Sequence, residues 1–300
     1  MGDTLKFRSL QIPRPAKSAV QPAHNMLSAH PSTALEYRFF KLNAGPVALL
    51  VDWIARRKQN ENMLRVSIHS PHGRIVLFDK LSAPMIAGQN FITTRRTVGQ
   101  LNDIAWDLDI ECDDERIEPD IFPAKLLRMT DLTLVSAPLA RFTGWVQHGS
   151  LRVEVGRAPG MISHYWGRQL PQEWWWVSVN QFEQEDVALE CIVLRSGLWG
   201  IPIGLPLAYL YLCDANGRRF ILSPPAQVQV KGTPETFEIQ VQPSRAKTIT
   251  LKAQGSEYGD LGDGILNTLV GDLEVWEGNR LLARANGTAG LERRVPGHGS

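Results

Sequence analysis

Residues 164–182 read HYWGRQLPQEWWWVSVNQF, and they hold four of the nine tryptophans of the chain. The second half, WWWVSVNQF, is typical of a β-strand because aromatic and β-branched residues dominate it. Side chains alternate across a strand, so Trp175, Val177 and Val179 share a face that predicts packing. The other face, which mixes apolar rings with polar groups as a lipophilic pocket does, carries Trp174, Trp176, Ser178, Asn180 and Phe182. The alternative is that both faces pack in a core.

The same strand pattern runs through most of the chain. From Glu36 onward, short aromatic and β-branched runs are separated by turn signals such as DANGR at 214–218 and EGNR at 277–280. The stretch IAWDLDIEC at 104–112 alternates apolar and acidic residues, as a half-buried strand does. No segment beyond Glu36 keeps a helical period for more than about two turns. The sequence therefore predicts an all-β fold, and its length fits two antiparallel barrels in tandem.

Three parts follow from this pattern. Residues 1–34 contain several prolines and little periodic hydrophobicity, which predicts a mobile N-terminal arm. We expect an N-terminal barrel over 35–157 and a C-terminal barrel over 158–294.

Composition excludes several classes of function. A formal net charge of +1 argues against a nucleic-acid binder, which needs a concentrated basic surface. Three cysteines without a Cys-x-x-Cys pair make a disulfide framework or a zinc site improbable, so we expect no metal. No dinucleotide, P-loop or Gly-x-Ser-x-Gly motif occurs, so we expect no cofactor. Without a signal-like or membrane-spanning apolar run, we expect a cytoplasmic protein.

The stretch GWVQHGSLRVEVGRAPGMISHYWGRQLPQEWWWVSVNQFE at 144–183 resembles tocopherol cyclase and its bacterial relatives. The motifs that match in order are Gly144-Trp145, Ala158-Pro159, Trp166-Gly167, Leu170-Pro171, Trp174-Trp175-Trp176, Asn180 and Phe182. The similarity continues through later strands and covers roughly the C-terminal half of the chain. The chain differs where it has EYRFFKL instead of the Gly-Trp-Tyr-Phe of the cyclases, and His164-Tyr165 instead of their Lys-Asn.

The resemblance implies two lipocalin-like barrels and an apolar cavity, as in the related carotenoid 1,2-hydratases. It also implies acid-assisted chemistry on a prenylated or polyene lipid. A double bond is protonated, and either a phenol oxygen or water traps the resulting cation.

Such chemistry needs a proton donor, and two residues are candidates. Asp52 lies within the apolar run VALLVDWIARR and shares a strand face with Leu50 and Ile54. Burial there would raise the pKa of its carboxyl, although it could instead pair with Arg56 or face water. His164 stands beside the tryptophans and could donate a proton, although a purely structural role is also open. Glu190 in VALECIVL is a weaker candidate for a buried carboxyl.

Aromatic side chains are the main candidates for the wall of the pocket. An aromatic face attracts a positive centre by about 0.5–2 kcal/mol per contact, so several rings could stabilise a carbocation. We expect the substrate-binding residues to be Trp53, Tyr165, Trp166, Arg168, Trp174, Trp176, Asn180, Tyr209 and Tyr211. Core packing remains the alternative for the two last tyrosines, and a surface position remains the alternative for Arg168.

Three hypotheses follow. The first is a cofactor-independent cyclase or hydratase acting on a lipophilic small molecule, with peripheral membrane contact during substrate pick-up. The second is a lipocalin-like carrier or sensor that binds such a molecule without changing it. The third is a structural role, in which the tryptophans fill the interface between the barrels and leave no cavity.

Overall fold

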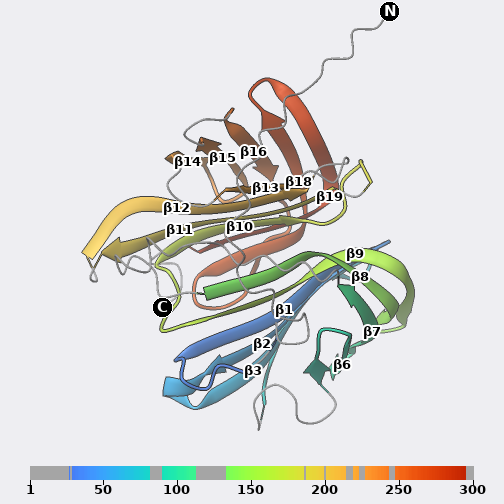
Figure 1. The fold of residues 1–300 in the computed structure, drawn as a ribbon. Helices are drawn as coiled ribbons and strands as arrows, with labels where there is room; N and C mark the ends of the chain where they lie inside the picture. Colours follow the sequence, from blue (N-terminus) through green and yellow to red (C-terminus); the bar gives the residue numbers. More distant parts are fainter. Residues whose placement is uncertain are drawn as a thin grey trace, which may run out of the picture.

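The computed structural model describes residues 27, 29–81, 90–112, 133–185, 187–198, 201–213, 219–222, 227–242 and 247–294. These residues form two antiparallel sheets, which Figure 1 shows stacked on one another. The fold is all-β, as predicted, with two tandem lipocalin-like barrels. Within the described ranges, the one helical element is the 3-10 turn η2 (Arg57–Gln59).

The first sheet has the strand order β4-β3-β2-β1-β9-β8-β7-β6-β5. Its strands are β1 (Leu35–Ala44), β2 (Val47–Arg56), β3 (Glu61–Ser70), β4 (Gly73–Lys80), β5 (Phe91–Ile92), β6 (Arg96–Leu101), β7 (Ile104–Cys112), β8 (Thr133–His148) and β9 (Leu151–Gly167). Strands that follow one another in sequence pair antiparallel, except β4 and β5, which lie at opposite ends of the strand order. The pairing of β1 with β9 brings the first and last strands of this half together.

The second sheet has the strand order β13-β12-β11-β10-β19-β18-β16-β15-β14, and β17 pairs with β18. Its strands are β10 (Glu173–Val179), β11 (Ala188–Leu198), β12 (Ile201–Cys213), β13 (Arg219–Leu222), β14 (Gln227–Gly232), β15 (Thr236–Gln242), β16 (Ile249–Gln254), β17 (Gly259–Asp260), β18 (Ile265–Glu277) and β19 (Arg280–Arg294). The pairing of β10 with β19 repeats the first-to-last pairing of the first sheet.

Each sheet surrounds a core of its own. In the first, Phe40, Trp53, Trp106 and Phe142 are completely buried and their rings lie close together. In the second, Trp175 packs with the aliphatic side chains that alternate along β10, β11 and β15. Burial of these side chains supplies the main driving force for folding.

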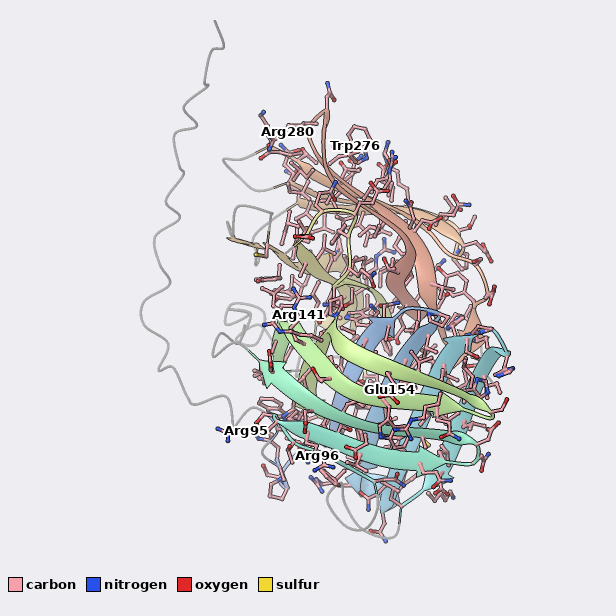
Figure 2. All side chains as sticks on the ribbon, turned by 90° about the vertical axis from the view of Figure 1, so that its right-hand side faces the viewer. Arg95, Arg96, Arg141, Glu154, Trp276 and Arg280 are labelled. Carbon is pink, nitrogen blue, oxygen red and sulfur yellow. The ribbon has the colours of Figure 1, made fainter. Side chains whose placement is uncertain are left out.

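The outer face of the first sheet is exposed to solvent at β7 and is covered by the second sheet at β1, β2 and β9. On β7 the acidic residues point away from the core, where Asp107 pairs with Arg96 at 2.9 Å. Arg96 and Glu154 stand on this exposed surface in Figure 2. The outer faces of β1, β2 and β9 instead pack on β10 through a third cluster, which includes Phe39, Leu50, Met161, Trp174 and Trp176.

Two features of the structure concern the parts into which the chain was expected to divide. Strand β9 runs across the expected division between 157 and 158 and stays in the first sheet as far as Gly167. The residues of the arm that the structure describes are docked on the first barrel, because Leu27 is buried in its core and His30 stacks on Trp166 at 3.8 Å. The expectation of mobility for 1–26 lies outside the described residues. In the described parts of the chain, no helix has the length and apolar character to cross a membrane.

Candidate active site

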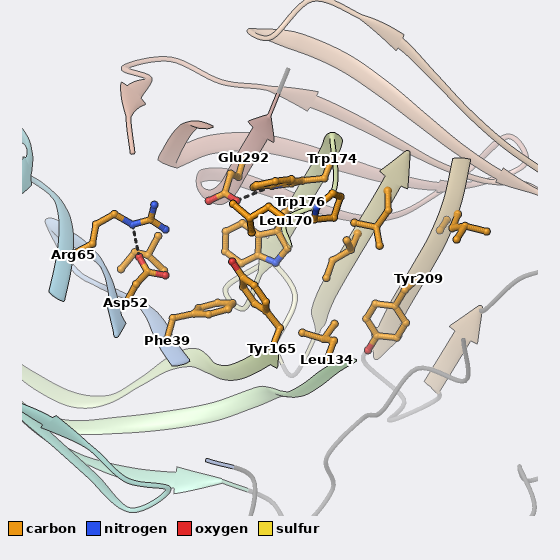
Figure 3. A pocket seen from close by; sticks show the side chains of 16 residues that line it. Phe39, Asp52, Arg65, Leu134, Tyr165, Leu170, Trp174, Trp176, Tyr209 and Glu292 are labelled. Carbon is orange, nitrogen blue, oxygen red and sulfur yellow. Dashed lines mark hydrogen bonds and ion pairs between the residues drawn. The ribbon is translucent and has the colours of Figure 1, made fainter. Parts of the chain in front are cut away.

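A pocket lies between the two barrels rather than inside either one, and it has a cavity volume of about 120 Å³. Figure 3 shows it from close by. Its lining comes from both sheets and from the connection between β9 and β10. The lining residues are Phe39, Leu50, Asp52, Arg65, Leu134, Tyr165, Leu170, Pro171, Trp174, Trp176, Ile192, Leu194, Leu207, Ala208, Tyr209 and Glu292.

Strand alternation explains why these side chains meet. On β10, Trp174 and Trp176 point away from the core of the second barrel and toward the first sheet. On β1, Phe39 points outward toward them, and its ring meets that of Trp176 edge to face at 5.9 Å and 84°. Most of the wall is therefore apolar and aromatic, which favours a lipophilic ligand.

One end of the pocket holds a buried ion pair. Arg65 on β3 donates from Nε to Oδ2 of Asp52 on β2 at 2.9 Å. Its Nη1 also donates to the carbonyl oxygen of Leu261 at 2.9 Å. Burial alone would lower the pKa of Arg65, but the charge of Asp52 raises it above its usual range. The pair therefore keeps a charged guanidinium and a carboxylate in an otherwise apolar site.

Glu292 on β19 is the second acidic group at this end. Its Oε1 accepts a hydrogen bond from Nε1 of Trp174 at 2.8 Å, and its Oε2 accepts one from Nδ2 of Asn267 at 3.4 Å. Burial raises the pKa of Glu292 to about 7, against the opposing effects of Arg65 and of the Trp174 hydrogen bond. The carboxyl of Glu292 can therefore give or take a proton near neutral pH.

Tyr165 on β9 also lines this end. Its ring stacks on Tyr37 with centroids 4.5 Å apart and planes 15° apart. Burial raises the pKa of Tyr165 well above its usual value, so it stays a neutral phenol that can donate a hydrogen bond.

A third carboxyl stands behind the pocket wall. Glu190 on β11 is completely buried, and its Oε1 accepts a hydrogen bond from Nε1 of Trp176 at 3.3 Å. Burial raises the pKa of Glu190 to about 7, against the opposing effects of Ser136 and Trp176. Trp174 and Trp176 thus each donate a hydrogen bond to a buried carboxyl on a neighbouring strand, Glu292 on β19 and Glu190 on β11.

Five of the residues expected from sequence lie together in the pocket: Asp52, Tyr165, Trp174, Trp176 and Tyr209. The other six lie elsewhere. Trp53 and Trp166 pack in or against the core of the first barrel, Tyr211 packs with Ala188 and Cys213, and Arg168 is exposed.

His164 and Asn180 are buried away from the pocket lining. Because His164 pairs with Arg38 across β1 and β9, its ring points into the first barrel, where Nε2 lies 3.0 Å from Oε1 of Glu36. Asn180 donates to the carbonyl oxygen of Pro138 at 2.7 Å and so helps to join the two sheets.

Sequence reasoning missed Arg65 and Glu292. Arg65 alternates with Leu64 and Val66 in NMLRVSIHS, a pattern that is equally typical of a strand with a solvent-facing side. Glu292 stands next to two arginines at the end of a strand, where charged residues are ordinary. No grouping of three or more His, Cys, Asp or Glu side chains suited to a metal occurs among the described residues.

The fold and the pocket together define a tandem lipocalin-like protein with a site between its barrels. Its structure is similar to that of kievitone hydratase from Nectria haematococca, with a TM-score of 0.61 and 8% identity over 94% of this chain and 95% of that chain. It is also similar to CghA in complex with Sch210972, with a TM-score of 0.59 and 11% identity over 89% and 90% of the two chains.

A third similar structure is a protein assigned as AttH from Nitrosomonas europaea, with a TM-score of 0.58 and 13% identity over 91% and 95% of the two chains. At these identities the likeness establishes the shared fold. No family model matches the chain, and no curated protein matches it in sequence.

Proposed function

We propose that this protein is a cofactor-independent cyclase or hydratase that protonates an alkene of a prenylated or polyene substrate in the pocket between the barrels. The observation that carries this proposal is Glu292, a carboxyl whose pKa is raised by burial to about 7 beside the indoles of Trp174 and Trp176. A protonated carboxyl in an apolar pocket combines an acid with a substrate-binding surface.

In the proposed reaction, the O–H bond of Glu292 breaks as the alkene π electrons form a new C–H bond. A tertiary cation is left on the neighbouring carbon, and the carboxylate of Glu292 remains. An oxygen lone pair, from the substrate itself or from water, then forms the C–O bond. The proton lost from that oxygen returns to Glu292, which restores the enzyme.

The residues around the pocket stabilise both charged species of this step, the carboxylate of Glu292 and the tertiary cation. The carboxylate of Glu292 is stabilised by the indole N–H of Trp174 and by the positive charge of Arg65. The cation would lie against the faces of Trp174, Trp176 and Phe39, which attract positive charge and offer no strong nucleophile.

The choice of proton donor differs from what the sequence suggested. Asp52 lines the same pocket, but its Oδ2 accepts the hydrogen bond from Nε of Arg65 in a buried ion pair. We assign to Asp52 the role of offsetting the positive charge of Arg65 beside Glu292. His164 contacts Glu36 inside the first barrel, and we assign it a structural role.

The similar structures give independent support for this type of chemistry. One of them is named as a hydratase, and another holds a small molecule, Sch210972. Neither name identifies the substrate of this chain.

Incubation with prenylated phenols and with polyenes, followed by mass spectrometry, tests the proposal. A cyclase gives an isomer of the substrate with a new ring, and a hydratase gives a product heavier by one water. Recovery of only unchanged ligand, bound in the pocket, would favour the carrier hypothesis instead.

A further inference from the structure

The hydroxyl of Tyr165 is the one polar group of the pocket lining that faces the space without a partner among the described residues. Asp52 is bonded to Arg65, Arg65 also to Leu261, and Glu292 to Trp174. Tyr165 lines the pocket but makes no hydrogen bond with the described parts of the chain. Its hydroxyl is not one of the fully buried polar atoms that lack a partner, so it is open to the pocket space. Tyr209, in contrast, has its hydroxyl sealed among protein atoms.

The position of the Tyr165 ring is well defined. Strand β9 is paired on both sides, with Tyr165 opposite Tyr37 on β1 and opposite Leu134 on β8. Stacking on Tyr37 fixes the plane of the ring. In Figure 3 the hydroxyl is directed toward Trp176 and Glu292 rather than toward Leu134. A hydrogen-bond donor held in this way is preorganised for a ligand.

The pocket is also polarised along its length. Glu292 on β19 lies on one side of β10, close to Asp52, Arg65 and Tyr165. The aliphatic lining residues Ile192, Leu194 and Leu207 come from β11 and β12 on the other side of β10, where Figure 3 shows Leu134 and Tyr209. A ligand that matches this distribution has an oxygen-bearing head group and an apolar tail. The Tyr165 hydroxyl is open to the pocket space, so a ligand that displaces water from it must offer an acceptor or leave the donor unsatisfied.

We propose that the Tyr165 hydroxyl donates a hydrogen bond to the oxygen that traps the cation, and that this oxygen belongs to the head group of the substrate. This inference rests on the proposed function and adds to it a residue that positions the attacking oxygen. Tyr165 occupies one lone pair of the oxygen and holds the other toward the carbon next to the one that Glu292 protonates. Burial keeps Tyr165 neutral, so it acts as a donor and not as a base.

The test uses 2-geranylphenol and geranylbenzene, which differ only in the phenol oxygen. Quenching of tryptophan fluorescence reports binding, because Trp174 and Trp176 line the pocket. We expect the native protein to bind the phenol more tightly than the hydrocarbon. In Tyr165→Phe this preference should fall by about fivefold, as expected for the loss of one neutral hydrogen bond, while affinity for the hydrocarbon stays the same.

Tyr258→Phe is the matched control, because the hydroxyl of Tyr258 also lacks a hydrogen-bond partner among the described residues but does not line the pocket. Its preference for the phenol should equal that of the native protein. An unchanged preference for the phenol in Tyr165→Phe would overturn the inference. Loss of that preference in Tyr209→Phe instead would also overturn it, because the head group would then bind beside Tyr209.

Different experiments test the role of Tyr165 and the proposed function, so either one can be refuted without the other. Binding of the two probes tests Tyr165 without any turnover, whereas loss of product in Glu292→Gln tests the acid. If the native protein cyclises the phenol but Tyr165→Phe keeps the full binding preference, the proposed enzymatic function is supported and the role of Tyr165 is refuted.

Discussion

The carboxyl of Glu292 and the indole N–H of Trp174 are joined by a hydrogen bond of 2.8 Å at the boundary between the two barrels. Both side chains point out of the second barrel into the pocket. The bond stabilises the ionised carboxyl, and burial stabilises the neutral one, so their balance sets the pH at which Glu292 holds a proton.

The first prediction concerns the pH dependence of turnover. Because the pKa of Glu292 is raised to about 7, the acid is protonated below that pH and ionised above it. The rate should therefore fall as pH rises through about 7. Glu292→Gln keeps the shape of the side chain but removes the acid, and it should lower kcat by about 100-fold or more. A pH–rate profile of both proteins checks this, and a Glu292→Gln enzyme of native activity would refute it.

The second prediction separates the hydrogen bond from the aromatic wall. Trp174→Phe keeps a ring in the pocket but removes the N–H that favours the ionised carboxyl, so the pKa of Glu292 should rise further. The falling limb of the pH–rate profile should move to higher pH. Trp175→Phe, which alters the core of the second barrel, should leave the limb in place. A limb that stays put in Trp174→Phe would contradict the assignment.

The third prediction concerns Asp52, whose substitution should move the falling limb of the pH–rate profile to lower pH. Asp52 raises the pKa of Glu292, and it also offsets the charge of Arg65, which lowers that pKa. In Asp52→Asn the limb should therefore shift to lower pH. Asp107→Asn breaks a comparable pair with Arg96 on the exposed surface and should not shift it. A shift to higher pH in Asp52→Asn would count against the electrostatic account.

The fourth prediction concerns stability and not catalysis. Burial would raise the pKa of Glu36, but the hydrogen bond from His164 and the charge of Arg38 lower it to about 2, from 4.5. Since the folded-state pKa is depressed, this stabilisation is present above about pH 4.5 and is lost as pH falls toward 2. At pH 7, Glu36→Gln should lower the free energy of unfolding by about 3–5 kcal/mol, because it leaves Arg38 buried and unpaired.

Urea denaturation of the native protein and Glu36→Gln at several pH values measures this difference. The gap between the two should narrow below about pH 4.5. Glu154→Gln breaks only the exposed pair with Arg152, and it should change stability by less than about 1 kcal/mol. An equal effect of the two substitutions would show that the Glu36 pair contributes no more than a surface pair.

Strand periodicity predicted the all-β fold class and the side of the strand on which several pocket-lining residues lie. Alternation in WWWVSVNQF separated Trp174 and Trp176 from Trp175, and the structure places the first two in the pocket and the third in a barrel core. The same rule placed Asp52 on one face with Leu50, and both line the pocket. Period-two patterns carry this information because neighbouring side chains on a strand point to opposite faces.

The other polar residues of the pocket depend on how the two barrels dock. Arg65 and Glu292 lie on outer faces of their barrels, which in a single barrel would face water. Only the packing of one sheet on the other turns these faces inward, and no local period encodes that contact. His164 illustrates the opposite error, because the register of β1 with β9 turns its side chain into the first barrel and away from the pocket.

The most direct test of the central claim is the reaction of a prenylated phenol in heavy water. The carboxyl of Glu292 exchanges its proton for deuterium, so transfer to the alkene should place one deuterium on the carbon next to the new C–O bond. We predict this label in the product of the native protein and no product above background with Glu292→Gln. A product without carbon-bound deuterium, or undiminished labelling by Glu292→Gln, would contradict proton transfer from Glu292.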